Sequence, residues 1–72
     1  MARALNRLGK RVSALRLARS LTQEQAAEIA KLDGKHWQDI ERARTNPTVA
    51  SLVGIARALK VTLADLFELD EK

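Results

Sequence analysis

The stretch 22–47 constrains the fold of this chain more than any other part of the sequence. Thr22 and Gln25 have the spacing of a capping box, in which a threonine and a glutamine three residues later close the start of a helix. A turn follows at 31–32, and the carboxylate of Asp33 is suited to accept the free N–H groups of a second helix. The pattern therefore predicts two short helices joined by a tight turn.

The second of these helices separates apolar from polar side chains. Trp37 and Ile40 are three residues apart and face inward, since positions i and i+3 lie on one side of a helix. The other face carries hydrogen-bonding side chains: Lys35, His36, Gln38, Asp39 and Arg42. A helix divided in this way and held across a shorter helix has the geometry of a helix-turn-helix that reads DNA.

The rest of the chain predicts further helices around this pair. An apolar stripe begins at Leu5, and its helix is either capped late by Asn6 or starts earlier. Capping threonines at 48 and 62 open two more helices. The fold class is therefore all-α, a compact five-helix bundle with helices near 5–19, 22–30, 33–43, 48–59 and 62–69. The expected core comprises Val12, Leu15, Ala27, Trp37, Ile40, Leu52, Ile55 and Leu59.

Composition limits the classes of protein that fit. A chain of 72 residues supports a single domain over 1–72 with one small core. It has no cysteine, so neither a disulfide framework nor a thiolate zinc site is possible. The apolar runs are too short to span a membrane, and the N-terminus lacks the apolar region of a signal peptide, so a cytoplasmic location is expected.

Charge is distributed unevenly along the chain. The first 20 residues hold six basic side chains and no acidic one, whereas the last eight hold four acidic side chains and one basic. The basic end attracts polyanions, and the acidic end repels them. The plainer alternative is a solvated surface whose charge happens to be lopsided.

Four segments in order resemble the phage-repressor/Cro-like (XRE-type) helix-turn-helix family, over about Leu8 to Phe67. The first is L-G-K-R-V-S-A-L-R at 8–16, and the second is T-Q-E-Q-A-A at 22–27. The third is W-Q-D-I-E-R-A-R-T-N-P at 37–47, and the last begins I-A-R-A-L-K-V at 55. The resemblance implies a lambda-repressor-like fold and a sequence-specific transcriptional regulator of bacterial or phage origin that binds double-stranded DNA.

Within this family, the short length and the final Leu-Phe are most similar to small restriction–modification controller proteins. Those proteins are dimeric and carry no separate small-molecule effector domain, so the resemblance implies neither a cofactor nor an enzymatic activity. The other class to consider is an antitoxin-type protein-interaction module that also regulates its own operon. A neighbouring toxin gene would favour that class, and a restriction–modification operon or prophage would favour the first.

The resemblance also assigns roles at the DNA surface. It places the recognition helix at about 33–43, in the major groove, where Lys35 can donate to guanine and Gln38 can pair with adenine. Gln23, at the start of the preceding helix, is expected to hold a phosphate. The full set expected to contact DNA is Gln23, Gly34, Lys35, His36, Gln38, Asp39, Arg42, Arg44, Thr45 and Asn46. The bland alternative is a solvated helix face.

The family pairs the positions of Arg16 and Glu41 in a partly buried salt bridge, so their side chains are expected within hydrogen-bonding distance. The chain also departs from the family. Lys31 replaces the turn glycine, which implies either a strained left-handed residue or a different turn, while Ala43 replaces another glycine. Trp37 stands where isoleucine is usual, and its indole can fill volume left by small alanines.

A recognition helix alone reads few base pairs, so a homodimer on a palindromic operator is expected. The last helix supplies the candidate interface: Leu63, Leu66, Phe67 and Leu69. Alternatively, these side chains simply cap the monomer core. Catalysis is not expected, because His36, Asp39 and Glu41 do not all share one helical face. No metal site is expected either, because a zinc site would need more ligands than the chain evidently offers.

Overall fold

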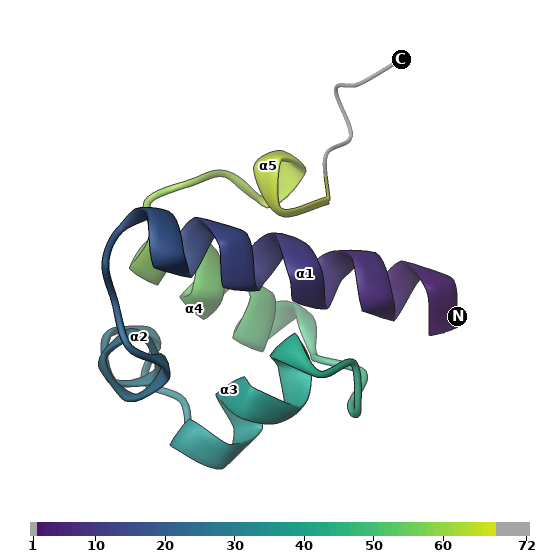
Figure 1. Cartoon of the computed structure of the whole chain (residues 1–72), viewed down its shortest axis with the longest axis horizontal. Helices are drawn as coiled ribbons and strands as arrows, with labels where there is room; N and C mark the ends of the chain where they lie inside the picture. Colours follow the sequence, from purple (N-terminus) through teal and green to yellow (C-terminus); the bar gives the residue numbers. More distant parts are fainter. Residues whose placement is uncertain (1, 68–72) are drawn as a thin grey trace.

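The computed structural model describes residues 2–67, and Leu69 of the expected interface lies outside them. The described residues form helices and connecting turns, with no strand among them. The helices are α1 (Ala2–Ala18), α2 (Gln23–Ala30), α3 (Gly34–Glu41), α4 (Val49–Leu59) and α5 (Leu63–Phe67). The all-α prediction is confirmed, and Figure 1 shows how the five helices are arranged.

The first helix starts earlier than the apolar stripe indicated. α1 begins at Ala2 and passes through Asn6 and Gly9 without a break. Alanine and arginine are strong helix formers, so Arg3 and Ala4 continue the helix although both are exposed. The expectation of a late cap at Asn6 was therefore wrong, and the alternative of an early start holds.

Threonine side chains close the starts of three helices, as the sequence predicted. In the capping box of α2, the Gln25 N–H donates to Thr22 Oγ1 at 3.0 Å, and the Thr22 N–H donates to Gln25 Oε1 at 2.9 Å. Thr48 accepts from the N–H of Ser51, and the Thr62 hydroxyl accepts from the N–H of Asp65. These side chains satisfy N–H groups that have no partner within their helices.

α3 begins differently. Asp33 is its N-cap residue in an extended conformation, but the Asp33 carboxylate makes no capping hydrogen bond. Only its backbone carbonyl takes part, accepting the N–H of Trp37 at 3.0 Å. The expected carboxylate cap is therefore wrong, and the exposed side chain is left to solvent.

The chain leaves four helices through left-handed residues that are not glycine: Ser20, Lys31, Ala43 and Lys60, with φ between 57° and 61°. After α3, the Ala43 N–H donates to the Ile40 carbonyl at 3.1 Å and the Arg44 N–H to the Asp39 carbonyl at 2.8 Å. This pair of bonds is the Schellman motif, which satisfies the last carbonyls of a helix. α3 thus ends at Glu41, two residues before the expected boundary, and the left-handed Lys31 is confirmed.

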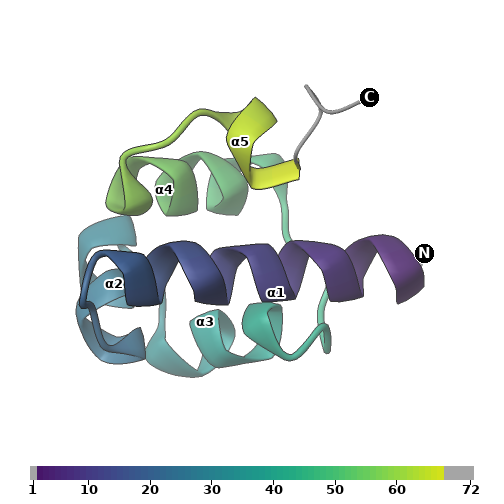
Figure 2. The ribbon, with the colours of Figure 1, turned by 45° about the horizontal axis from the view of Figure 1, so that its top comes forward.

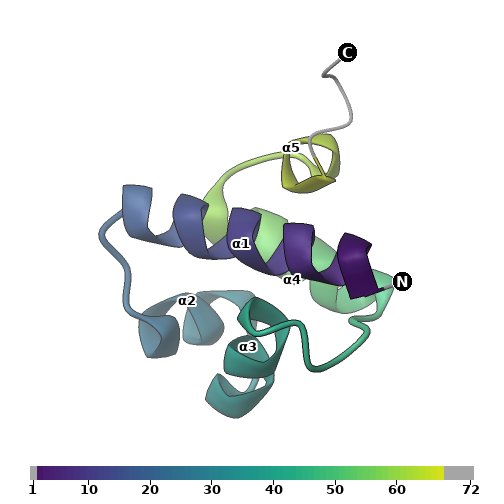
Figure 3. The same cartoon turned by 45° about the vertical axis from the view of Figure 1, so that its right-hand side comes forward.

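The long helix α1 lies between two groups of helices. α2 and α3 lie on one side of it, α4 packs against α2, and α5 lies on the far side from α3, against α1 and α4 (Figures 1 and 3). Figure 2 shows α4 and α3 on opposite sides of α1. α3 therefore stands at one end of the molecule, with one side against α1 and α2 and the other open.

One core joins all five helices. Six of the eight expected core residues are buried, whereas Leu15 and Leu52 are only partly buried and pack against the others. Trp37 is fully buried and belongs to the same core as the alanines of α2. The buried set is Leu8, Val12, Ala26, Ala27, Ala30, Trp37, Ile40, Ile55, Ala56, Ala58, Leu59 and Leu66.

Gly9 allows α1 to approach the end of α3 closely. A Cβ atom built on Gly9 would lie 2.5 Å from the carbonyl oxygen of Glu41 and 2.8 Å from that of Ile40. Since real Cβ atoms do not come this close to backbone oxygens, any larger residue would push α3 away. This crossing therefore sets the distance between α1 and α3.

Candidate nucleic-acid interface

The Glu41 carboxylate holds α3 against two other helices. Arg16 of α1 donates through Nε to Oε2 at 2.6 Å and through Nη2 to Oε1 at 3.2 Å, so the predicted salt bridge is confirmed. Trp37 Nε1 donates to Oε2 at 2.6 Å, and Gln23 Nε2 of α2 donates to Oε1 at 2.9 Å. Four donors thus occupy the acceptor positions of one carboxylate.

Burial and hydrogen bonding have opposite effects on the pKa of Glu41. Burial by itself raises the pKa of Glu41, but hydrogen bonds from Arg16, Gln23 and Trp37 outweigh it and leave the pKa below its ordinary value. Arg16 also donates through Nη1 to the Leu21 carbonyl at 2.8 Å. The network therefore joins α1, the turn before α2, and both ends of the helix-turn-helix unit in one charged, hydrogen-bonded group.

The outward side of α3 has few contacts. Lys35 is extended into solvent with its side chain 79% exposed, and its Nζ lies 3.8 Å from Oδ1 of Asp39 one turn along. Gln38 and Asp39 are half-buried on the same helix. These three side chains offer an ammonium, an amide and a carboxylate, which are the groups that read base edges in the major groove.

His36 approaches another helix of the chain. Its Nε2 lies 3.4 Å from Oγ of Ser51, in the first turn of α4, and the ring is half-buried. The ring therefore lies between α3 and α4. Gly34, at the start of α3, has open space where a Cβ would stand, so packing within the chain does not require glycine there.

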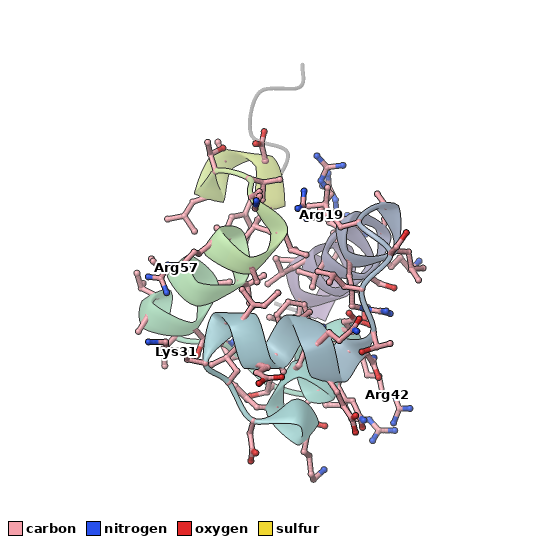
Figure 4. The ribbon with its side chains drawn as sticks, turned by 90° about the vertical axis from the view of Figure 1, so that its left-hand side faces the viewer. Arg19, Lys31, Arg42 and Arg57 are labelled. Carbon is pink, nitrogen blue, oxygen red and sulfur yellow. The ribbon has the colours of Figure 1, made fainter. Side chains whose placement is uncertain are left out.

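The residues after α3 extend the candidate interface. Arg42, Arg44 and Asn46 are exposed, and Thr45 is half-buried. In Figure 4, Arg42 lies at the end of the molecule that carries α3, away from Arg19. Gln23 is brought to the same region, because its amide reaches the last residue of α3. The structure thus gathers most of the predicted DNA-contact residues around one end of the bundle.

The expected dimer residues separate into two groups. Leu66 is 1% exposed and belongs to the monomer core, so its assignment to an interface was wrong. Its position toward α1 and α4 is what lets α5 pack on them. Leu63 and Phe67 remain 40% and 39% exposed, and their four-residue spacing places them on one face of α5.

Two further features of the described residues concern metal binding and membrane spanning. Within 2–67, no three histidine, aspartate or glutamate side chains are grouped closely enough to hold a metal ion. None of the described helices is both long and apolar enough to cross a membrane.

Sequence reasoning missed two contacts in the carboxylate network. The bond from Trp37 to Glu41 was open to prediction, because the residues are four apart on one helix face. The hydrogen bond from Gln23 to Glu41 joins two different helices, and no local sequence pattern predicts it. The same holds for His36 and Ser51, which are far apart in sequence.

The fold and the site together define a helix-turn-helix domain: the short helix α2 is followed by a tight turn and by α3, whose outward side is polar and open. Residues 7–69 match the model of the helix-turn-helix domain family, and the chain belongs to this family. The prediction of the family from sequence is confirmed.

Known proteins support this membership. The chain is 42% identical over 57 residues to the immunity repressor protein of Bacillus phage phi105. This match covers 79% of this chain and 40% of that protein. It is 34% identical over 62 residues to the HTH-type transcriptional regulator DdrOP3 of Deinococcus deserti, covering 86% and 48%. The chain therefore spans less than half the length of each of these relatives.

Among solved structures, the restriction–modification controller protein C.AhdI from Aeromonas hydrophila superimposes with a TM-score of 0.86 at 32% identity. The match covers 88% of this chain and 96% of that one. These relatives are an immunity repressor, a transcriptional regulator and a controller protein, in agreement with the expectation that the chain is not an enzyme.

Proposed function

We propose that the chain is a transcriptional regulator that binds a specific double-stranded DNA site through α3. The observation that carries this proposal is the contrast within α3, whose inward residues Trp37 and Glu41 are fully engaged while Lys35 extends into solvent. Donors and acceptors on the open side suit base edges, and the arginines that follow suit phosphates.

Selection of bound duplexes from a random pool tests this function. A defined sequence motif should emerge, and Lys35→Ala should relax the preference at one or two base pairs, each good bidentate contact being worth roughly 1–3 kcal/mol. Arg44→Ala should instead weaken all sequences alike and flatten the salt dependence. If no motif emerges from the wild-type pool at low salt, sequence-specific recognition is excluded.

We further propose that the chain binds as a homodimer to a palindromic operator. Leu63 and Phe67 support this, because two large apolar side chains are partly exposed on one face of α5. A two-fold dimer repeats the recognition helix, so the half-sites should lie about 10 base pairs apart.

Sedimentation at micromolar concentration decides the assembly. Wild-type chain should sediment as a dimer, and Leu63→Asp should give a folded monomer with lost operator binding. Val49→Asp is the matched control, because Val49 is also exposed, at 72%, but lies at the start of α4 rather than on α5. A wild-type monomer at these concentrations, with unchanged operator binding by Leu63→Asp, would exclude the α5 interface.

A further inference from the structure

A hollow of about 430 Å³ opens beside the recognition helix, between α1, the start of α2 and the end of α3. Lys10, Gln23 and Arg42 line it, together with Ser13, Ala14, Leu17 and Glu41. Lys10 and Arg42 are exposed, so their charges face solvent. The proposed contacts of α3 with base edges do not use this hollow.

The acidic residue in the lining does not oppose an anion. The Glu41 side chain is only 6% exposed, and it is paired with Arg16 at 2.6 Å. Its oxygens already accept bonds from Gln23 and Trp37 as well. The negative charge of Glu41 is thus neutralised by Arg16. The positive charges of Lys10 and Arg42 therefore determine the electrostatic potential at the mouth of the hollow.

Gln23 links this hollow to the proposed DNA surface. Its amide nitrogen carries two hydrogens, and one of them is donated to Glu41. The residue is the first of α2, where backbone N–H groups favour a phosphate. Lys10 and Arg42 line the same hollow as Gln23, so they are the cations available to the phosphates next to the one held here.

The basic lining continues along α1. A second hollow of about 260 Å³ is lined by Arg7, Lys10, Arg11 and Ala14, and it shares Lys10 and Ala14 with the first. Arg11 is already engaged, because its Nε donates to the Asp65 carbonyl at 2.9 Å. Lys10 therefore stands at the junction of the two hollows, with its charge exposed to both.

We propose that the hollow between α1 and the end of α3 seats the DNA sugar–phosphate backbone, with Lys10 on α1 contacting a phosphate next to the one held by Gln23. The inference rests on the proposed DNA-binding function and extends the contact surface from the helix-turn-helix onto α1. The occupant is the phosphodiester backbone, because the two exposed charges that line the hollow are cationic.

The test begins with the salt dependence of binding to the duplex that the wild type selects. Lys10→Gln keeps much of the aliphatic stem but removes the charge, so affinity should fall severalfold for specific and random duplexes alike. The slope of log affinity against log salt should shrink by about 0.9, the value for one phosphate contact. Arg19→Gln is the control, because Arg19 is an exposed cation remote from α3 (Figure 4). It should leave the slope unchanged.

Neutral methylphosphonates placed singly along the duplex then locate the contact. At one position the substitution should remove the difference between wild type and Lys10→Gln, and this position should adjoin the one that does the same for Gln23→Ala. A Lys10→Gln slope equal to that of the wild type, or a difference that persists at every position, overturns the proposal while leaving DNA binding intact. If the wild type binds no duplex, both the proposed function and this inference fail.

Discussion

The two sides of α3 differ in how strongly the protein itself determines their side chains. On the inward side, Trp37 and Ile40 are at most 1% exposed, and the Glu41 carboxylate accepts bonds from three residues. On the outward side, Lys35 has one long ionic contact and is mostly in solvent. Packing explains the first set completely and the second set hardly at all, so the outward residues are where a ligand has to be sought.

The largest expected effect comes from emptying the inward side. Trp37→Ala removes the largest fully buried side chain and the N–H that Glu41 accepts, so it should cost about 3–5 kcal/mol. A domain of this size has a free energy of unfolding not much larger than that loss, so a large fraction of the molecules should be unfolded at room temperature. Urea unfolding followed by circular dichroism measures the loss.

Trp37→Phe is the matched control, because it keeps an aromatic ring and removes the indole N–H. It should be destabilised by clearly less than Trp37→Ala. Equal losses in the two variants would mean that the hydrogen bond, rather than the filled volume, dominates at this position.

Glu41→Gln should follow, with a loss of about 2–3 kcal/mol, because Arg16 then keeps its charge in a half-buried site without an anionic partner. Glu24→Gln changes an exposed carboxylate on α2 and should alter stability by less than about 0.5 kcal/mol. Denaturant midpoints of both variants decide the point. Similar midpoints would show that the Glu41 network adds little to stability.

Acid should remove the same contribution gradually. The folded-state pKa of Glu41 lies below its ordinary value, so its contribution is fully present above the unfolded pKa of about 4.3. It is lost as the pH falls from there through the lowered pKa. Free energies of unfolding measured between pH 3 and 7 should therefore decline less steeply in Glu41→Gln than in the wild type.

Substitutions at two glycines test the surroundings of α3 on its inward side and at its exposed start. Gly9→Ala puts a methyl group 2.5 Å from the Glu41 carbonyl oxygen and should cost about 1–3 kcal/mol. Gly34→Ala meets nothing within 4 Å and should be neutral or stabilising by up to about 0.5 kcal/mol. Thermal unfolding of the two variants gives the comparison, and a stable Gly9→Ala would mean that α1 can shift at no cost.

A modest stabilisation is expected where α3 ends. Ala43 holds φ at 59°, so Ala43→Gly should stabilise the chain by about 1 kcal/mol by relieving a left-handed alanine. Ala14→Gly, at an exposed position inside α1, should have the opposite sign. A shared sign in the two unfolding curves would rule out relief of backbone strain as the cause.

Local patterns predicted most of the fold and the inward side of the site. Capping signals located the starts of α2, α4 and α5, and the family pattern located the pair of Arg16 and Glu41. These features rest on residues close in sequence or on a shared motif. The helix period likewise placed Trp37 and Ile40 inside.

Contacts between different helices could not be predicted from local sequence patterns. Periodicity shows which face of a helix is apolar, but not whether Leu66 meets its own core or another chain, and the structure buries it. It also does not show that His36 approaches Ser51 of α4. The cap at Asp33 failed for another reason, since an exposed carboxylate can be solvated by water instead.

Trp37 gives the protein a fluorescent reporter of its own. It is the single tryptophan of the chain, and its ring lies wholly out of water on the helix proposed to enter the major groove. Indole emission moves to longer wavelength when the ring meets solvent, so a red shift would signal that α3 has left its seat. A DNA titration that leaves the emission wavelength constant would show that the recognition helix docks as a rigid body.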